Sequence, residues 1–349
     1  MTIEDLINRL KKHCSYAVLA AKKFNAKRFY LQTNLSKKDI LEFEDFENTP
    51  IERAVSLKNL INQKAIELIK KDSDLVLDQI DPEILINIDL INDKVVVRHS
   101  NIYIYVRYLK KTREYAQHVW ACPSCKGKGC KKCNYTKEKY PSIESAFKEI
   151  FVKEFGASDC ILHASGREDV DVMTLGHGRP AVIEIVNPTK TTSDLELIAQ
   201  KIKQNYPLEI LQPKIVKKFW IEAICNSHFD KKYYAIVSSK TKELTKNDFE
   251  LLKNSCPILL KQRTPLRVLK RRTDMIRERY ILDLKLEKIE DKKLHLIIYA
   301  QAGTYIKEFI SGDGGRTHPS VSSILKTECN CEELTLIDVN DFFVNTLKS

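Results

Sequence analysis

Residues 165–188 read SGREDVDVMTLGHGRPAVIEIVNP and join a crowded group of charges to a predicted strand. An arginine is followed by three carboxylates within four positions, those of Glu168, Asp169 and Asp171. The segment AVIEIV is rich in β-branched residues, which favour extended structure. Two interpretations stay open at this point: a solvated turn that enters a strand, or a site where one carboxylate is kept charged for chemistry.

The chain on the C-terminal side of residue 141 is predicted to contain several strands and few helices. Strands are indicated at FWIEAIC (219–225), YYAIVSS (233–239), RYILDLKLEKI (279–289) and LHLIIYAQ (294–301). Helices are predicted at 140–155, with Ser142 as N-cap, and at 193–204, where Ser193 and Glu196 have capping-box spacing. Because crossover helices do not alternate with the strands, this pattern predicts an α+β fold with a mainly antiparallel, mixed sheet.

The first third of the chain is predicted to be a separate α/β unit. Helical spacing of apolar residues is found in TIEDLINRL (2–10), SYAVLAAKKF (15–24) and PIERAVSLKNLINQKAIELIKK (50–71), where Pro50 fits a first helical turn. Extended patterns follow in EILINIDL (83–90) and VVVRHSNIYIYVRY (95–108).

Four of the ten cysteines form a cluster between these two regions. CPSCKGKGCKKC places Cys122, Cys125, Cys130 and Cys133 in two Cys-x-x-Cys pairs. This spacing is typical of a tetrahedral zinc site, and Gly127 and Gly129 let the backbone fold back on itself. Four thiolates leave no coordination position for water, so the predicted zinc is structural. Disulfides are the alternative, but six further cysteines are scattered, which fits a reducing compartment.

The charge balance indicates a polyanionic partner. Lys and Arg total 58 against 47 Asp and Glu, which gives a net charge of +11. Nucleic acid is the first candidate and an anionic membrane surface is the second. The first residues do not resemble a secretion signal, and no run approaches the roughly 20 apolar residues that span a bilayer. We therefore expect a cytoplasmic protein with no membrane partner.

Three separated blocks resemble one enzyme family. The stretch 165–188, RTPLRVLKRR (263–272) and QAGTYIKEFISGDGGRTHPS (301–320) are similar to the catalytic domain of family ten of the tRNA pseudouridine synthases, found in archaea and eukaryotes. Residues 106–136 also resemble archaeal members, in which a THUMP-type RNA-binding module precedes a cysteine cluster. Members often carry a further Cys-x-x-Cys near the N-terminus, where this chain has only Cys14.

The resemblance implies a division into three parts and one reaction. These parts are a THUMP-like RNA-binding module at 1–118, a four-cysteine zinc cluster and linker at 119–140, and a pseudouridine synthase domain at 141–349. The implied reaction isomerises uridine to pseudouridine in the T-arm of tRNA, at positions fifty-four or fifty-five or both. It breaks the bond from uracil N1 to the ribose and rejoins the base through C5, with no organic cofactor and no small-molecule cosubstrate.

The resemblance also assigns roles inside the pocket. The Gly-Arg-Glu-Asp motif matches residues 166–169 and makes Asp169 the catalytic aspartate, whereas the residues alone leave the choice between Asp169 and Asp171 open. Lys307 is the basic residue expected on a strand beside that aspartate, and Tyr305 would face the same side of an extended chain. Tyr233 resembles the tyrosine that stacks on the target base.

Basic residues outside these motifs are predicted to contact the tRNA backbone. Seven of them lie in residues 263–279, a run that by itself is more often a solvated face. The residues assigned to RNA binding are Arg107, Lys110, Arg113, Arg267, Arg271 and Arg272. Two rival functions are a non-catalytic tRNA-binding or chaperone protein and a metal-dependent nuclease that holds magnesium through Asp169 and Asp171.

Overall fold

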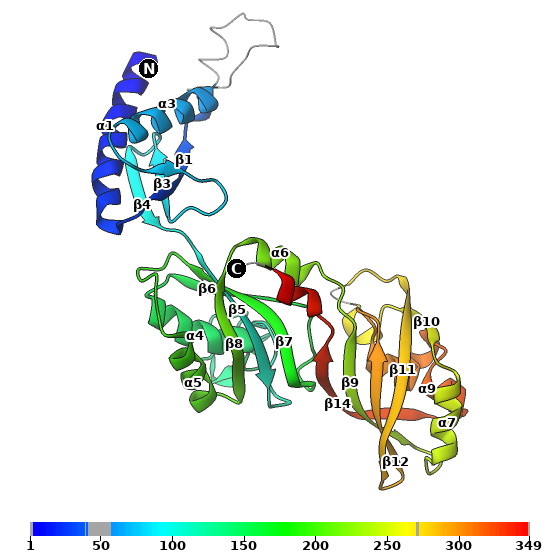
Figure 1. Ribbon diagram of the computed structural model, residues 1–349. Coiled ribbons are helices and arrows are strands. Elements are labelled where there is room, and N and C mark those ends of the chain that lie inside the picture. The colour runs from blue at the N-terminus through cyan, green and yellow to red at the C-terminus, as the bar shows by residue number, and fades with distance from the viewer. Residues whose placement is uncertain (1–2, 39, 41–56, 270–271, 348–349) are drawn as a thin grey trace, which may run out of the picture. The chain divides into compact units, whose positions relative to one another are not determined.

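The computed structural model describes the chain except residues 1–2, 39, 41–56, 270–271 and 348–349 (Figure 1). The chain divides into two compact units. The first comprises Met1–Ile102 together with the short segments Phe155–Asp159 and Ile185–Ser193, and the second comprises the remainder. Each unit is built around its own hydrophobic core.

In the part that the structure describes, the first unit is a four-stranded sheet covered by α-helices α1 and α3. Its elements are α1 (Ile3–Ala21), the 3-10 helix η1 (Lys22–Phe24), β1 (Arg28–Asn34), α3 (Leu57–Lys71), β2 (Val76–Leu77), β3 (Ile84–Asp89) and β4 (Lys94–His99). The strand order is β2-β1-β3-β4, with β1 parallel to β2 and β3. Buried and exposed residues alternate along β1 because only one face of the sheet packs on the helices. Leu10, Phe29 and Ile61 are among the residues of that core.

Several elements predicted for this unit are found. The two short helices expected before residue 25 form the single helix α1, and the strand expected at 83–90 is β3. Pro50 and the predicted first turn of the third helix lie outside the described residues.

The second unit is organised around a ten-stranded sheet (Figure 1). Its strands are β5 (Ile102–Lys110), β6 (Asp159–Ala164), β7 (Met173–Val186), β8 (Leu208–Val216), β9 (Lys231–Ser239), β10 (Ile258–Arg263), β11 (Ile276–Glu290), β12 (Lys293–Ala300), β13 (Thr317–His318) and β14 (Cys329–Val339). The order is β13-β10-β11-β12-β9-β14-β7-β5-β8, with β6 paired to β7. Strands β10, β11, β12, β9 and β14 pair antiparallel in succession, and β14 pairs parallel with β7. A mixed, mainly antiparallel sheet is therefore confirmed.

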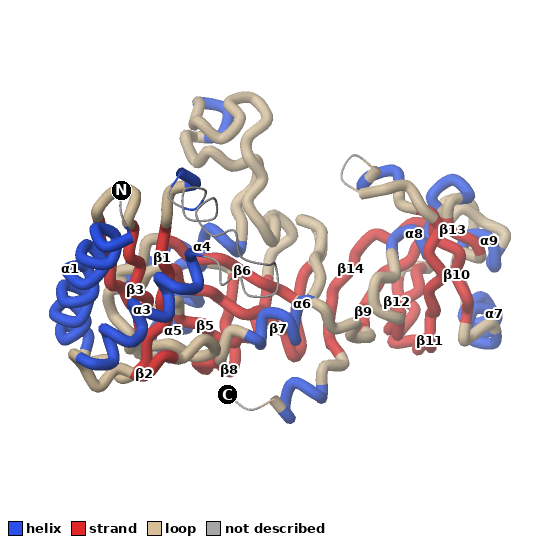
Figure 2. Tube along the Cα trace, turned by 90° about the horizontal axis from the view of Figure 1, so that it is seen from above, coloured by secondary structure: helices blue, strands red, loops and turns tan. Residues whose placement is uncertain are grey.

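Helices cover both ends of this sheet. They are α4 (Ile143–Phe155), α5 (Leu195–Asn205), α6 (Phe219–Cys225), α7 (Lys246–Asn254), α8 (Ile306–Ser311) and α9 (Val321–Leu325), with 3-10 helices η3 (Lys131–Cys133), η4 (Leu266–Val268), η5 (Asp313–Gly315) and η6 (Phe342–Thr346). Figure 2 shows α4 and α5 at the end formed by β5–β8, and α7 and α9 beside β10 and β11. Each end has a core of its own, and Tyr233 on β9 packs against both cores. This position puts Tyr233 at the junction of the two halves.

Three local predictions for this unit are wrong. Residues 219–225 form helix α6 and not a strand, because Trp220 and Ile224 face the core one helical turn apart and a short apolar run does not distinguish the two structures. The N-cap of α5 is Asp194, whose carboxylate accepts from Leu197 N at 3.0 Å, and not Ser193. Residues 306–311 form a helix and not the expected strand. The predicted cap of α4 is confirmed, since Ser142 Oγ accepts from Ser145 N at 3.1 Å.

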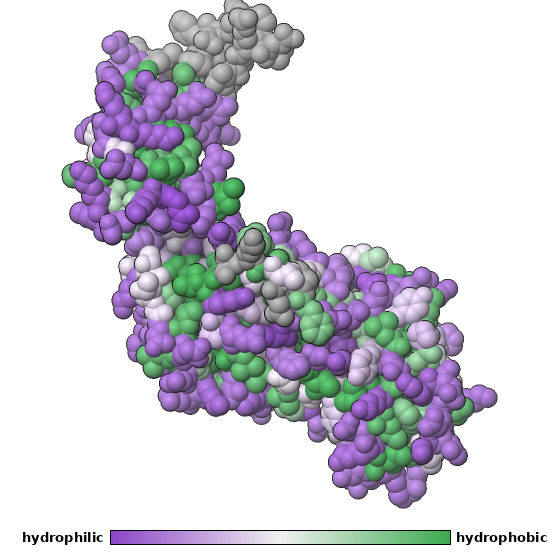
Figure 3. Space-filling view, in the orientation of Figure 1, coloured by the Kyte–Doolittle hydropathy of each residue, from purple (hydrophilic) through white to green (hydrophobic). Residues whose placement is uncertain are grey.

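Hydrophilic side chains cover most of the face shown in Figure 3, and hydrophobic ones are scattered among them. Among the described residues, no helix combines the length and the apolar content that crossing a membrane requires.

Candidate active site

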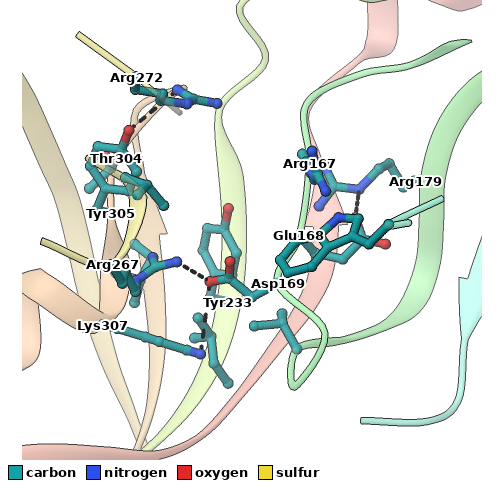
Figure 4. Close-up of a pocket in the computed structure, with 15 residues that line it drawn as sticks. Arg167, Glu168, Asp169, Arg179, Tyr233, Arg267, Arg272, Thr304, Tyr305 and Lys307 are labelled. Atoms are coloured by element: carbon teal, nitrogen blue, oxygen red, sulfur yellow. Dashed lines mark hydrogen bonds and ion pairs between the residues drawn. The ribbon is translucent and has the colours of Figure 1, made fainter. Parts of the chain in front are cut away.

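A pocket of about 230 Å³ brings together residues that are far apart in the sequence. It is lined by the segment that follows β6, by Tyr233 of β9, by the loop that contains η4, and by the start of α8 (Figure 4). Six residues predicted to act in catalysis or RNA binding line this pocket: Asp169, Tyr233, Arg267, Arg272, Tyr305 and Lys307. The three sequence blocks therefore form one site.

Asp169 lies in this pocket between two cations. Its Oδ2 is 2.6 Å from Nη1 of Arg267 and 3.9 Å from Nζ of Lys307. Its side chain is 39% exposed, so the carboxylate is accessible from the pocket. The sequence assigned the neighbouring positive charge to Lys307, whereas the closer cation is Arg267.

Arg267 links Asp169 to a second acid. Its Nε donates to Oε1 of Glu308 at 2.6 Å, and Glu308 is buried in α8. Burial by itself would lower the pKa of Arg267, but hydrogen bonds and charges from Glu308 and Asp169 raise it above its ordinary value. Arg267 therefore stays charged and is held by protein carboxylates on both sides.

Lys307 makes its shortest contacts with Asp171. Its Nζ donates to Oδ1 at 2.7 Å and to Oδ2 at 2.6 Å. Burial favours a raised pKa for Asp171, but the hydrogen bond and charge of Lys307 outweigh it and lower that pKa. Lys307 is in helix α8, and Tyr305 is the extended residue that precedes this helix, so the predicted strand is replaced by a helix start that still presents both side chains to the pocket.

A buried polar network lies behind the pocket, and we call it the floor. It consists of Glu168, Arg179, Tyr108 and Gln117. Glu168 is 2.8 Å from Arg179 Nε, and its two oxygens accept from the Tyr108 hydroxyl at 2.9 and 3.0 Å. The side chains of Glu168 and Arg179 are 1% and 2% exposed, so the pair is almost dry. The floor fixes the backbone immediately before Asp169.

Gly166 lets the chain pass over this floor. Its φ of +76° is rarely adopted by residues with a side chain, and an added Cβ would lie 3.3 Å from Arg179 Nη1. Gln117 Nε2 also donates to the Gly166 carbonyl at 3.0 Å. The positive φ and the nearby guanidinium of Arg179 therefore explain why this position is a glycine.

Two of the residues predicted to bind RNA, Arg107 and Lys110, are buried inside the protein. Arg107 is 8% exposed and pairs with Asp341 while donating to the Gly178 carbonyl at 3.1 Å. Lys110 is 0% exposed and donates to the carbonyls of Asp169 at 3.1 Å and Val170 at 2.8 Å. Burial also lowers the pKa of Lys110 to about 8. Both side chains are buried against protein groups, whereas the prediction of phosphate contact assumed exposed side chains.

The remaining predicted residues lie at or near the surface. Arg272 is exposed and donates to the Tyr305 hydroxyl at 3.3 Å. Arg113 is half-buried, donates to the carbonyl of Asp171 at 2.8 Å and pairs with Glu333. Arg271 lies outside the described residues. Burial raises the pKa of Tyr233 to about 12, so its hydroxyl keeps its proton at neutral pH.

The four clustered cysteines converge as their spacing predicts. The four sulfur atoms all lie within 4.8 Å of one another. The sulfurs of Cys125 and Cys130 are 3.9 and 3.8 Å from that of Cys133. A tetrahedral zinc with bonds of about 2.3 Å requires sulfurs about 3.8 Å apart, so the cluster fits such an ion. The backbone N–H of Gly129 donates to the Cys125 sulfur, and the backbone N–H of Cys130 donates to the Cys133 sulfur. The cluster can hold one metal ion.

The floor was not found from the sequence. Glu168 and Arg179 both stand in the stretch 165–188, but nothing in the spacing shows that the arginine eleven residues later turns back to the glutamate. Tyr108 and Gln117 are further away still. Tyr108 and Arg179 come together because β5 and β7 are neighbours in the sheet, and Gln117 and Glu168 reach them from loops.

Comparisons with known proteins place these features in a family. The family model described as "Pus10, C-terminal" matches residues 103–340. The chain is 37% identical over 344 residues to "tRNA pseudouridine synthase Pus10" of Methanococcus voltae, covering 96% of this chain and 66% of that protein. It is 38% identical over 262 residues to the protein of the same name from Methanocaldococcus jannaschii, covering 74% of this chain and 58% of that protein. The chain thus spans less than two thirds of the length of these two relatives.

Among solved structures, a chain of a Cbf5-Nop10-Gar1 complex is 16% identical, with a TM-score of 0.32 over 67% of this chain and 58% of that chain. That TM-score is too low to support a conclusion about the fold or the site.

Proposed function

Since the chain belongs to the Pus10 family, we propose that it is a tRNA pseudouridine synthase that isomerises uridine in the T-arm. The observation that carries this proposal is the position of Asp169, which lies in a pocket beside Tyr233 with Arg267 in contact. The target is one or both of the two T-arm positions that the family resemblance implies.

The pocket residues divide the reaction among them. Tyr233 offers an aromatic face for a uracil that has left its stack. The carboxylate of Asp169 acts at the ribose as the bond from N1 to C1′ breaks, and the base then turns and bonds to C1′ through C5. One proton leaves C5 and one is gained at N1, so the reaction needs no oxidant and no cosubstrate. Arg267 and Lys307 place positive charge beside this carboxylate, with their nitrogens 2.6 and 3.9 Å from its Oδ2.

The other parts of the chain have supporting roles in this proposal. Of the predicted module 1–118, the part before β5 acts as a THUMP-like RNA-binding module, whereas β5 and Gln117 support the active site. Residues 119–140 hold a structural zinc through Cys122, Cys125, Cys130 and Cys133, and 141–349 carry the reaction. The exposed Arg272 contacts tRNA phosphate at the mouth of the pocket. Arg272→Ala should weaken the binding of all tRNAs alike and reduce the salt dependence of binding, because phosphate contacts release counterions.

The two rival functions have less support. Each carboxylate proposed to hold magnesium, Asp169 and Asp171, already contacts a protein cation. Among the described residues, the only group of three or more potential metal ligands is the four-cysteine cluster. A non-catalytic RNA-binding protein would have no need for a carboxylate held between cations at an aromatic face.

Unmodified tRNA transcript is the substrate that tests the proposal. After incubation with the protein, carbodiimide treatment and primer extension should give a stop at a T-arm uridine, with or without added magnesium. Asp169→Asn should bind the same tRNA and give no stop. Bound but unmodified tRNA with the unaltered protein would favour the non-catalytic rival, and cleavage that depends on magnesium would favour the nuclease.

A further inference from the structure

One side of the pocket is formed by two residues that the proposed chemistry does not use. Trp120 and Arg167 both line the cavity that contains Asp169 and Tyr233. Figure 4 shows Arg167 on the side opposite Arg267 and Lys307, with Asp169 and Tyr233 between them. The pocket therefore has an aromatic and a cationic group on the side away from the cations that contact Asp169.

These two side chains are in cation–π contact. The guanidinium carbon of Arg167 lies 5.4 Å from the centroid of the Trp120 ring, within the range of a cation–π contact. Trp120 is half-buried and Arg167 is exposed. Cation–π contacts at exposed sites contribute about 0.5–1 kcal/mol.

The segment that carries the cysteine cluster holds Trp120 in place. The Trp120 carbonyl accepts from Lys139 N at 2.8 Å, and Cys122 N donates to the Lys137 carbonyl at 2.8 Å. The two chain segments are also joined by a β-bridge between Ala121 and Glu138. Trp120 is thus two residues from a cysteine of the cluster, next to the β-bridge that joins the two ends of the segment carrying the cluster.

A Trp face beside an arginine is a typical site for an unstacked nucleobase. Bases of single-stranded RNA stack on aromatic rings and on guanidinium planes, and this stacking tolerates any base. Tyr233 is the surface for the target uracil, so a base on Trp120 belongs to a different nucleotide. On the basis of the proposed function, we propose that Trp120 and Arg167 bind a nucleotide next to the target uridine, with its base on the indole and its phosphate at Arg167.

Tryptophan fluorescence can test this subsite in the intact, metal-loaded protein. The chain has two tryptophans, and Trp220 is 0% exposed in the core. A T-arm stem-loop RNA should therefore quench the emission of Trp120 alone. Trp120→Phe should abolish the quench while it keeps most of the affinity, since it retains an aromatic face. Trp120→Ala should weaken binding by about 5- to 100-fold, the range expected for one base stack.

Altered RNA identifies the nucleotide involved. Stem-loops with an abasic residue on the 5′ or the 3′ side of the target should reproduce the loss seen with Trp120→Ala at one of these two positions. Combining that RNA with the variant should add little further loss, because both changes remove the same contact. Tyr135→Ala is the matched control, since Tyr135 is an aromatic residue of the same segment, is 66% exposed and does not line the pocket.

The outcomes separate this inference from the function on which it rests. If the unaltered protein forms no pseudouridine, the proposed function fails. If it forms pseudouridine while Trp120→Ala binds both the intact and the abasic RNA as the unaltered protein does, only the subsite is wrong. A quench that persists in Trp120→Phe would also overturn the subsite.

Discussion

Glu168 and Asp169 are consecutive residues with opposite surroundings. Glu168 belongs to the floor, where it is almost dry and contacts Arg179 and Tyr108. Asp169 belongs to what we call the rim, the group formed by Asp169, Asp171, Arg267 and Lys307, whose side chains all retain solvent exposure. This difference shows that neighbouring residues of one segment have separate roles. Glu168 in the floor holds the backbone in place, and Asp169 in the rim keeps its carboxylate accessible from the pocket.

The largest expected effects come from neutralising these two acids one at a time. Asp169→Asn should lower pseudouridine formation on the order of 10³-fold, the scale of losing a catalytic acid or base, with little change in stability. Glu168→Gln should lower the free energy of unfolding by about 3–5 kcal/mol, because it leaves the buried Arg179 without its counter-charge. Single-turnover assays and urea unfolding of both variants measure the two effects.

Asp171→Asn is the control for the rim. It should leave measurable pseudouridine, because Asp171 contacts Lys307 and not the arginine that holds Asp169. An active Asp169→Asn beside an inactive Asp171→Asn would reverse the assignment.

The next effect concerns the four-cysteine cluster, which belongs to neither the floor nor the rim. The unaltered protein should contain about one zinc per chain, and Cys125→Ser should lower metal affinity by more than the roughly 10- to 100-fold typical of losing an outer-shell partner. Amide exchange should speed up at Cys122 and Lys139, whose N–H groups donate across the β-bridge next to the cluster, and stay unchanged at Arg179 in the floor. Protein purified without chelator that contained no zinc would contradict the assignment of the metal.

Removing the cations of the rim should have a smaller effect. Arg267→Met removes a contact of 2.6 Å with Asp169 and should lower single-turnover rates about 10- to 100-fold, as expected for a charge-assisted hydrogen bond. Lys307→Met should have a weaker effect, since its distance to Asp169 is 3.9 Å. A larger loss in Lys307→Met would mean that the bound state changes which cation contacts Asp169.

The smallest effect is the dependence of stability on the charge of Asp171. Its pKa is lowered in the folded protein, so its contribution is fully present above the ordinary value of 3.8 and is lost as pH falls through the lower folded value. Its side chain is 64% exposed, so the contribution at neutral pH is at most about 1 kcal/mol. The difference in melting temperature between the unaltered protein and Asp171→Asn should therefore shrink on acidification. A difference that grew instead would contradict the assigned pairing with Lys307.

The sequence predicted those features that depend on local spacing. The Cys-x-x-Cys pairs, the Ser142 cap and the alternating strands around β9, β11 and β12 are encoded within a few residues of one another. The family resemblance predicted that Asp169, Tyr233, Tyr305 and Lys307 would share a site, and they line one pocket.

Features that depend on long-range packing were not predicted. Basic residues of β5 were assigned to RNA because charge alone does not reveal burial, and Lys110 is instead enclosed by backbone carbonyls. The contact of Asp169 with Arg267 was not predicted either, because the basic run 263–279 was assigned to RNA, and only the packing of its loop against the pocket brings Arg267 nearer than Lys307. Residues 219–225 were predicted as a strand but form helix α6, because a helix places both Trp220 and Ile224 in the core.

The contrast between Glu168 and Asp169 has a consequence for insertions and deletions. Gly166 must lie over Arg179, and Lys110 holds the carbonyls of Asp169 and Val170, so this short segment is fixed before and after Glu168. Deleting one residue between Gly166 and Glu168 would place the shorter side chain of Asp169 where Glu168 now contacts Arg179. Inserting one residue there would move Glu168 away from Arg179. The number of residues between Gly166 and Val170 is therefore constrained as strictly as their identity, and length variation in homologous chains should occur outside this segment.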